Sequence, residues 1–350
     1  MFNINNDKMD HCHEKFKEID KEWVKRKRKI NTSSIFDLLT ASAITNTGVS
    51  TKTQILDNHS HVALIKARNK LPDNAFKDIN TTLHSNILHK NNIFAIDGSK
   101  VKMLKGKEKY GYTSRTNDQD VPRPAKNPIC MLSALTGIQT DTIVNYTITK
   151  HFNERQCVHE LVKPLKKGDI VLFDRGYYSK DLYTFLTKSK LKCVMRIKKD
   201  ANRTVKSFYN SRKTQMLSYL IDDDGNKTKI RYTKKKIDGS MFVMCTNIFN
   251  CKVDRIMELY KMRWRVELSF KRLKSHLFVN KIKALTEKMW IQEFESRILL
   301  DSLTRCIQMS ANSGKMKKTI LYTYILFMVY FKITKNKINS KTYRHKCMMT

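Results

Sequence analysis

The order of strand-like and helix-like segments between residues 90 and 197 most constrains the fold of this chain. Three short apolar runs come first: "NIFAID" (92–97), "PICMLSAL" (128–135) and "DTIVNYTI" (141–148). Helix and strand patterns then alternate: "ERQCVHELVKPL" (154–165), "GDIVLFD" (168–174), "SKDLYTFLTKSK" (179–190) and "KCVMRI" (192–197). The order β-β-β-α-β-α-β predicts an α/β fold, with a mixed sheet and helices on both of its faces.

The segments on either side of this region have different patterns. Residues 1–88 read as helices, with one N-cap at Thr32 or Ser33 and a second helix over 60–71, ended by Pro72. Residues 199–250 read as irregular, with a hairpin turn at "DDDGNK" (222–227). A long helix is expected over 252–278.

The charge of the chain favours a nucleic-acid partner. Lys and Arg total 68 against 32 acidic residues, a formal charge of +36 spread along the sequence. A surplus of this size indicates a polyanionic partner, although a solvated basic surface is the alternative. The longest apolar run, residues 320–331, is too short to span a bilayer, so we expect a soluble protein without a membrane partner.

Cysteine and histidine patterns do not indicate a zinc site or disulfides. The eight cysteines include no C-x-x-C pair and are expected to be reduced thiols in a cytosol. His11, Cys12 and His13 are adjacent near the N-terminus, which is weak support for a metal site. The three aspartates at 222–224 are read as turn residues.

Two aspartates close buried strands. Asp97 ends "IFAID" and precedes Gly98, and Asp174 ends "IVLFD" and precedes Arg175. Ligands bind at the carboxyl ends of strands in open sheets. Either aspartate alone could be a turn residue, but the pair suggests a shared site.

A third carboxylate lies among basic residues in "YKMRWRVELSFKRLKSHL" (260–277). Tyr260, Arg263, Glu267 and Lys274 share one stripe of a helix, within an arc of roughly 60°. The alternative is a surface glutamate paired with Arg263 and Lys271. Three converging carboxylates would repel one another without a cation, and Mg²⁺ is the natural one because it prefers oxygen ligands. Two such ions can promote phosphodiester chemistry.

These residues resemble the DDE transposases of bacterial insertion sequences, of the insertion-sequence-four type. Tyr260, Arg263, Glu267 and Lys274 match the signature Y-(2)-R-(3)-E-(6)-K of that family at every position. The stretches "AIDGSK", "DRGYYSKDLYTFL" and "VMCTNIF" are also similar to its conserved regions.

The resemblance implies a ribonuclease-H-like catalytic domain over 89–310, with a β-rich insertion at about 199–250. A helical DNA-binding region, 1–88, would precede it, and a C-terminal segment with a basic tail, 311–350, would follow. The metal-binding catalytic triad would be Asp97, Asp174 and Glu267, with two Mg²⁺ ions that Mn²⁺ can replace. The residues expected to contact DNA are Tyr260, Arg263, Lys274 and Arg175.

The implied activity is metal-dependent cleavage and strand transfer at terminal inverted repeats. The implied partners are the transposon ends and target DNA, bound by a homodimer in a synaptic complex within the bacterial cytoplasm, at the nucleoid. Two other functions stay open: a DNA-binding regulator that keeps the fold without the chemistry, and another ribonuclease-H-like nuclease. Trp264 is expected to pack against the sheet, although a role in stacking on a base is the alternative.

Overall fold

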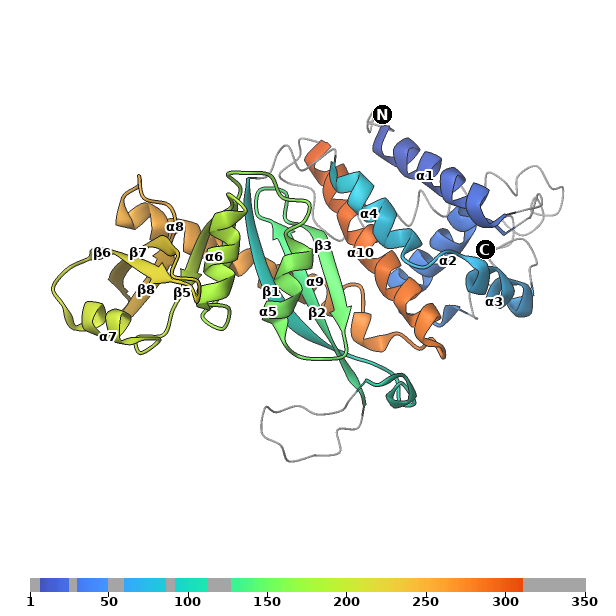
Figure 1. Ribbon diagram of the computed structural model, residues 1–350. Helices are drawn as coiled ribbons and strands as arrows, with labels where there is room; N and C mark the ends of the chain where they lie inside the picture. Colours follow the sequence, from blue (N-terminus) through green and yellow to red (C-terminus); the bar gives the residue numbers. More distant parts are fainter. Residues whose placement is uncertain (1–6, 25–29, 50–59, 86–91, 113–126, 311–350) are drawn as a thin grey trace. The chain divides into compact units, whose positions relative to one another are not determined.

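The computed structural model describes residues 7–24, 30–49, 60–85, 92–112 and 127–310, without the side chains of 7–13, 307, 308 and 310 (Figure 1). The chain forms two compact units. The sheet unit comprises His84–Val101 and Ile129–Lys271. The helical unit comprises Met1–Leu83, Lys102–Pro128 and Arg272–Thr350.

The sheet unit is built on one eight-stranded mixed sheet of order β3-β2-β1-β4-β5-β8-β7-β6. Its strands are β1 (Ile93–Lys102), β2 (Ile129–Gly137), β3 (Thr142–Thr149), β4 (Ile170–Phe173), β5 (Lys192–Arg196), β6 (Gln215–Ile221), β7 (Lys227–Ile237) and β8 (Ser240–Thr246). Strand β4 pairs in parallel with β1 and β5. The β2–β3 pair and the pairs that join β5, β8, β7 and β6 are antiparallel. The predicted mixed sheet is therefore confirmed.

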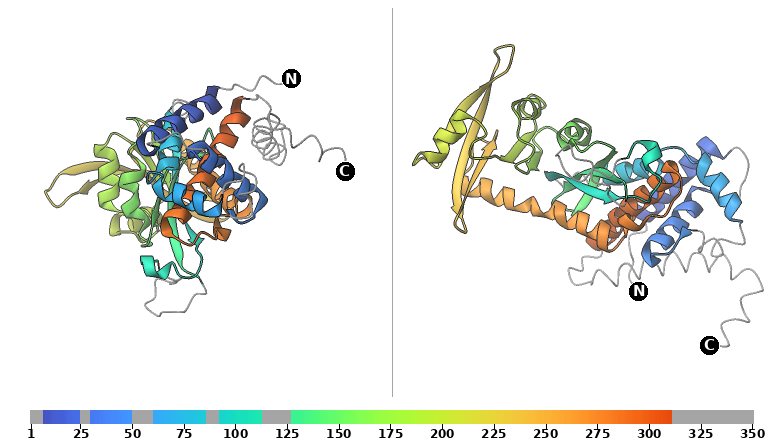
Figure 2. Two further views of the ribbon diagram at one scale, coloured as in Figure 1. Left: turned by 90° about the vertical axis from the view of Figure 1, so that its right-hand side faces the viewer. Right: turned by 90° about the horizontal axis from the view of Figure 1, so that it is seen from below.

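Successive side chains along each strand point to opposite faces of the sheet, and different helices cover the two faces. Phe94 and Ile96 of β1 join Phe173 of β4 in a fully buried core with α5 (Glu154–Leu161) and α6 (Lys180–Lys188). Residues of the opposite parity point to the other face, where α8 (Val253–Met262) contacts β4, β5 and β7. Figure 2 shows α5 and α6 on one side of the sheet and α8 on the other. Helices on both faces were predicted, and the structure confirms them.

The segment predicted as irregular extends the sheet. It contains α7 (Arg203–Asn210) and strands β6, β7 and β8. The turn after β6 is confirmed, because Asp222 Oδ1 accepts from the Asn226 backbone N–H at 2.7 Å. Gly225 there has a φ of +80°, which glycine adopts without a steric penalty.

The predicted single helix over 252–278 is wrong in one respect. It is divided into α8 and α9 (Trp264–Ser275), with Arg263 between them. The Arg263 N–H donates to Tyr260 O at 3.0 Å, and the Val266 N–H donates to Arg263 O at 3.1 Å. These bonds span three residues instead of four, so the chain tightens at Arg263.

The helical unit contains α1 (Asp7–Trp23), α2 (Thr32–Thr45), α3 (His61–Lys70), α4 (Ala75–Ser85), α10 (Glu287–Ser310) and the short 3₁₀ helices η3 (Glu108–Tyr110) and η4 (Val279–Lys281). The predicted cap of α2 is wrong, since Asn31 Oδ1 accepts from the Ser34 N–H at 2.8 Å. Thr32 instead donates its hydroxyl to Asp20 at 2.6 Å. The second helix begins at its Ser60 cap and ends before Pro72, as predicted.

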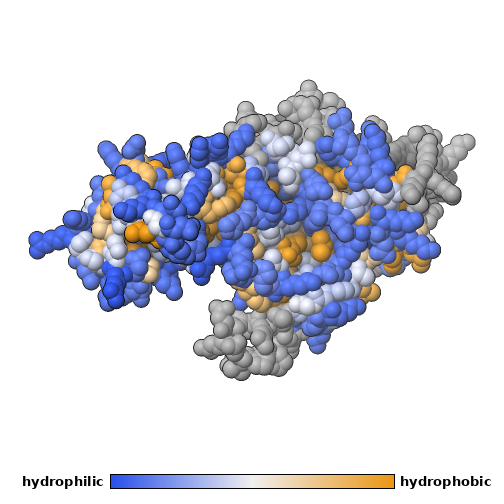
Figure 3. Space-filling model, in the orientation of Figure 1, coloured by the Kyte–Doolittle hydropathy of each residue, from blue (hydrophilic) through white to orange (hydrophobic). Residues whose placement is uncertain are grey.

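Helix α10 packs against α1, α2 and α3. Arg272, at the C-terminal end of α9, is buried and pairs with Asp301 of α10 at 3.2 Å. Most of the surface in Figure 3 is hydrophilic. Within the described residues, no helix combines the length and apolar character needed to cross a membrane. The 320–331 run, the basic tail and the side chains of His11, Cys12 and His13 lie outside the described part.

Candidate active site

Asp97 and Asp174 lie side by side on neighbouring parallel strands. The β1–β4 pairing ends at Ile96 and Phe173, the residues immediately before the two aspartates. Paired strands are about 4.8 Å apart, so the two carboxyl groups start from adjacent positions. Both residues alternate with the side chains that face α5 and α6, and therefore point toward the face covered by α8. Strand β1 itself continues to Lys102, so the prediction that it ends at Asp97 is wrong, although its pairing with β4 does end there.

Residues from α8, α9 and the break between them reach both aspartates. Tyr260 donates its hydroxyl to Asp174 Oδ1 at 2.9 Å. Arg263 donates through Nη1 to Asp97 Oδ2 at 2.9 Å and through Nη2 to Glu267 Oε1 at 2.6 Å. The break at Arg263 places its guanidinium between two carboxylates that are far apart in sequence. Five of the predicted site residues therefore lie together: Asp97, Asp174, Tyr260, Arg263 and Glu267. Arg175 directly follows Asp174 in the chain.

Lys274 does not belong to the same compact unit as these residues. It belongs to the helical unit, whereas Tyr260, Arg263 and Glu267 belong to the sheet unit. Burial and the charge of Lys102 both lower the pKa of Lys274. Its predicted contact with DNA stays a prediction.

The two aspartates differ in their readiness to ionise. Burial raises the pKa of Asp97 to about 6, against the opposing charge of Arg263. Burial also disfavours the charged form of Asp174, but the backbone N–H of Arg175 and the hydroxyl of Tyr260 overcome it and hold its pKa below the ordinary value. Asp97 also accepts hydrogen bonds, from the Gly98 N–H and from Arg263, but burial and the negative charges of Glu154 and Asp174 outweigh them.

Arg263 is the positive centre of the group. Burial acts to lower its pKa, yet the hydrogen bond to Glu267 and the charge of Asp97 raise it above the ordinary value. Its side chain is 11% exposed, compared with 19% for Asp97 and 35% for Glu267. Glu267 is thus more open to solvent than Asp97. One guanidinium faces three carboxylates, which leaves this group with an excess of negative charge.

The donor set suits a hard divalent cation, since carboxylate oxygens are the ligands that Mg²⁺ takes. The residues described include no cluster of three or more His, Cys, Asp or Glu side chains arranged to hold a metal. Arg263 instead bridges Asp97 and Glu267. The oxygen donors and the excess negative charge of the carboxylates fit a cation. The guanidinium of Arg263 provides positive charge between Asp97 and Glu267.

A fourth carboxylate, that of Glu154, lies against Gly98, the residue that follows Asp97. Glu154, in the first turn of α5, accepts a hydrogen bond from the Tyr177 hydroxyl at 2.7 Å. A Cβ atom on Gly98 would collide with the Glu154 carboxyl group, so a larger residue there would force the Glu154 side chain to move. The negative charge of Glu154 also raises the pKa of Asp97. The sequence analysis did not find Glu154, because nothing in the sequence brings α5 next to Gly98.

A basic pocket adjoins Asp174 within the sheet unit. It has a volume of about 230 Å³ and is lined by Arg175, Arg196, Lys198 and Lys199, among others. Arg196 lies 4.4 Å from the centre of the Phe242 ring, and its charge contributes to the low pKa of Asp174. Arg196 was missed, although it ends strand β5 just as Asp174 follows β4. Asp97 and Asp174 were selected because each closes a buried strand, and the same criterion applied to β5 would have identified Arg196.

The prediction that Trp264 packs against the sheet is wrong. Its side chain is 59% exposed. The tightened turn at Arg263 begins a new helix at Trp264, and the apolar positions that follow, Val266 and Phe270, take the buried face instead.

Comparison with known proteins accounts for this geometry. The profile of the transposase DDE domain family matches residues 88–290, more than half of the chain. The chain belongs to the transposase DDE domain family. This confirms the resemblance drawn from the spacing of Tyr260, Arg263, Glu267 and Lys274.

A protein of Synechocystis sp. that bears the name of a transposase for insertion sequence element IS4SA is 26% identical over 170 residues. That match covers 45% of this chain and 47% of the relative, so the chain spans about half the length of the curated relative that it matches. Among solved structures, the piggyBac transposase in its synaptic complex with hairpin DNA has a TM-score of 0.52 and 14% identity. The match covers 97% of this chain and 81% of that one. It shows that the folds agree, and the predicted ribonuclease-H-like α/β class is confirmed.

Proposed function

We propose that this transposase DDE domain protein cuts and joins DNA at the terminal inverted repeats of an insertion sequence. The observation that carries the proposal is that Asp97, Asp174 and Glu267 converge, with Tyr260 and Arg263 between them. They lie where the pairing of the central strands β1 and β4 ends. The family match supports the same function.

In this proposal, Asp97, Asp174 and Glu267 are the catalytic residues, and together they hold two Mg²⁺ ions, which Mn²⁺ can replace. When bound, such ions activate a water or a 3′-hydroxyl and stabilise the leaving oxygen of the phosphodiester. The hydroxyl of Tyr260 orients Asp174. The low pKa of Asp174 keeps it ionised at neutral pH, so it remains able to bind a cation.

Basic side chains beside the carboxylates would hold the DNA backbone. Arg175 and Arg196 line one pocket next to Asp174, and their positive charges suit phosphate groups. We assign Tyr260, Arg263 and Lys274 to the phosphates of the transposon end, on the strength of the family signature. Residues 1–88 are proposed to recognise the repeats, and 89–310 to carry out the reaction.

We further propose that two copies of the chain act as a homodimer on the two ends of the element, at the bacterial nucleoid. Joining both ends to target DNA requires that they be held together while the strands are exchanged. Light scattering with and without repeat DNA would report the dimer directly.

The decisive experiment is strand cleavage with the purified protein and a labelled duplex that spans the inverted repeat flanking its own gene. We expect cuts at the repeat boundary with Mg²⁺ or Mn²⁺, and none with Glu267→Gln. The loss should be at least about 10³-fold, since a removed ligand forfeits several kcal/mol of transition-state stabilisation. Binding of the repeat without any cut, under both metals, would replace this proposal with a DNA-binding regulator.

A further inference from the structure

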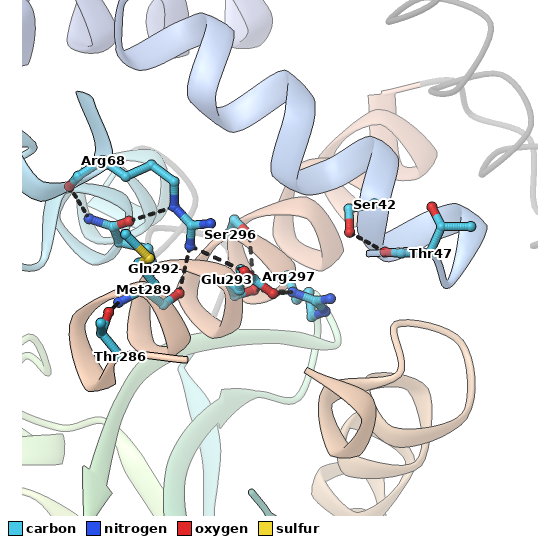
Figure 4. Close-up of polar contacts among 9 residues, drawn as sticks. All are labelled: Ser42, Thr47, Arg68, Thr286, Met289, Gln292, Glu293, Ser296 and Arg297. Carbon is cyan, nitrogen blue, oxygen red and sulfur yellow. Dashed lines mark hydrogen bonds and ion pairs between the residues drawn. The ribbon is translucent and has the colours of Figure 1, made fainter. Parts of the chain in front are cut away.

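The helical unit contains a pocket of about 580 Å³ in which buried positive charge lacks a matching anion. The walls come from α2, α3, α10 and the segment around η4. Figure 4 shows the polar side chains at this place, with Arg68 extending from α3 toward Gln292 and Glu293 of α10. A pocket of this size accommodates a small organic ligand.

Two buried arginines share a single carboxylate at the pocket. Arg68 and Arg297 are each 4% exposed. Arg68 Nη2 lies 3.2 Å from Glu293 Oε1, and Arg297 Nη1 lies 3.9 Å from Glu293 Oε2. The closer contacts of Arg297 are to backbone carbonyls, Glu293 O at 2.6 Å and Leu277 O at 2.9 Å. Neutral carbonyls orient the guanidinium without cancelling its charge.

The buried group therefore has a positive excess. Arg68 also donates to Gln292 Oε1 at 3.1 Å and Met289 O at 2.8 Å, both of them neutral acceptors. Among the described residues, Arg68 donates through its Nε and Nη2, Arg297 donates through its Nε and Nη1, and Glu293 is the one carboxylate that pairs with either guanidinium. Burial lowers the pKa of Arg297 to about 10, so its guanidinium remains charged at neutral pH. A buried charge of this kind is costly unless an anion meets it.

The rest of the pocket suits the organic part of an anionic ligand. Leu104 and Leu285, which also line it, are 36% and 76% exposed, unusually open for large apolar residues. Lys281 and Lys283 are exposed lining residues that place two further positive charges at the solvent side. Cationic and apolar walls thus meet in one pocket.

We propose that this pocket binds a phosphate ester, with its phosphate oxygens on Arg68 and Arg297 and its organic part against Leu104 and Leu285. Guanidinium groups bind phosphate oxygens through paired charge-assisted hydrogen bonds. The ester can come from two sources: a free mononucleotide, or a phosphodiester of DNA. The inference does not rest on the catalytic proposal, because none of these residues belongs to the sheet unit.

Calorimetric titration of the full chain with adenosine monophosphate tests the site. We expect one saturable site, weakened about tenfold or more in Arg297→Gln and in the double variant Lys281→Ala/Lys283→Ala. The matched control is Lys288→Ala, which removes one positive charge from α10 at a residue paired with Asp73 at 2.9 Å and should bind as the wild type does. The double variant changes only exposed side chains, so it decides the matter if Arg297→Gln does not fold.

Competition with a short DNA duplex distinguishes the two sources. If adenosine monophosphate displaces the duplex from the wild type and not from the double variant, the natural ligand is a DNA phosphodiester. If the nucleotide binds without affecting DNA affinity, it is a free phosphate ester. No saturation below ~1 mM, or equal affinity in both pocket variants and the wild type, would overturn the proposal. Glu267→Gln should bind the nucleotide normally, so failure of this site and failure of the catalytic proposal are separable.

Discussion

The carboxylates around Arg263 in the sheet unit and the pocket at Arg68 and Arg297 in the helical unit use the same kinds of side chain in opposite proportion. In the first, Arg263 faces Asp97 and Glu267, with Asp174 nearby. In the second, Glu293 faces Arg68 and Arg297. The first group is left negative and the second positive. The comparison teaches that the sign of the unpaired charge, more than the presence of an ion pair, indicates which ligand a buried polar group can take.

The largest expected effect comes from removing a charge on the negative side. Asp174→Asn should lower metal-dependent cleavage by at least about 10³-fold and leave repeat binding nearly unchanged, because the amide is a poor cation ligand of the same shape. Cleavage and gel-shift assays on one DNA measure both quantities. The control is Glu258→Gln, an exposed carboxylate of α8 that pairs with Arg255 at 3.0 Å. Wild-type cleavage by Asp174→Asn would remove Asp174 from the proposed triad.

Removing the carboxylate on the positive side should instead cost stability. Glu293→Gln leaves two buried guanidinium groups without a counter-charge, and we expect a loss of about 3–5 kcal/mol in the free energy of unfolding. Urea unfolding followed by tryptophan fluorescence suits this test, since Trp23 and Trp290 are buried in the helical unit.

Glu267→Gln provides the contrasting measurement in the absence of divalent metal. Because two carboxylates remain near Arg263, its cost should stay below about 1 kcal/mol, as for a partly exposed ion pair. Asp73→Asn, at an exposed partner of Lys288, should be equally mild. Equal losses in Glu293→Gln and Glu267→Gln would erase the difference between the two groups.

A substitution at Gly98 tests its close contact with Glu154. Gly98→Ala should destabilise the sheet unit by about 0.5–1.5 kcal/mol, because its new methyl group displaces the Glu154 carboxyl group from its hydrogen bond with Tyr177. In a chain that already carries Glu154→Ala, Gly98→Ala should cost little, and a double-mutant cycle by chemical denaturation measures the coupling. If the two changes are simply additive, Glu154 does not pack on Gly98.

A buried carboxylate of the helical unit predicts a pH effect. Burial raises the pKa of Asp37 in α2 to about 7 from an ordinary value of 3.8. The folded state therefore holds a proton that the unfolded state releases, and stability falls as the pH rises from about 4 to 7.

Asp37→Asn should remove this loss. We expect a gain of about 1–2 kcal/mol at pH 8 and none at pH 4, below the full linkage value because Asp37 keeps some solvent contact. Thermal melts at the two pH values measure it, with Asp73→Asn as the exposed control. An equal gain at both pH values would point to a cause other than ionisation.

The smallest effect concerns Lys274. If it contacts one phosphate, Lys274→Ala should lower the slope of log K against log salt by about 0.9 in magnitude. Repeat binding by fluorescence anisotropy over a range of salt concentrations measures the slope. Lys288→Ala, another lysine of the helical unit, should leave it unchanged. Equal slopes in both variants would withdraw Lys274 from the DNA contacts.

Much of the sheet could be predicted because its strands are local apolar runs. The segments 92–97, 168–174 and 192–197 were all found, and the aspartates that follow two of them were recognised as neighbours. The residue pattern alone did not identify the extension of the sheet by β6 to β8, because Leu217, Tyr219 and Ile221 are exposed and leave no continuous buried pattern. Only the family resemblance implied a β-rich insertion in this segment. Pairing partners, and not propensity, define those strands.

The roles of some side chains could likewise be predicted from the sequence, whereas others depend on tertiary packing. The helical period of residues 260–274 was enough to place Tyr260, Arg263 and Glu267 on one stripe. The break at Arg263 was invisible, so Trp264 was assigned to the wrong environment and the guanidinium bridge between Asp97 and Glu267 was not foreseen. Glu154 was missed for a similar reason, since it reaches Gly98 only after α5 has packed on the sheet.

The fold class, the family and the carboxylates of the candidate site could be predicted from the sequence, because each depends on local periodicity and spacing along one chain. How the charges balance follows from the tertiary structure. The partners of Arg263, Arg68 and Arg297 come from segments distant in sequence, and whether a buried charge is matched depends on every element that packs around it.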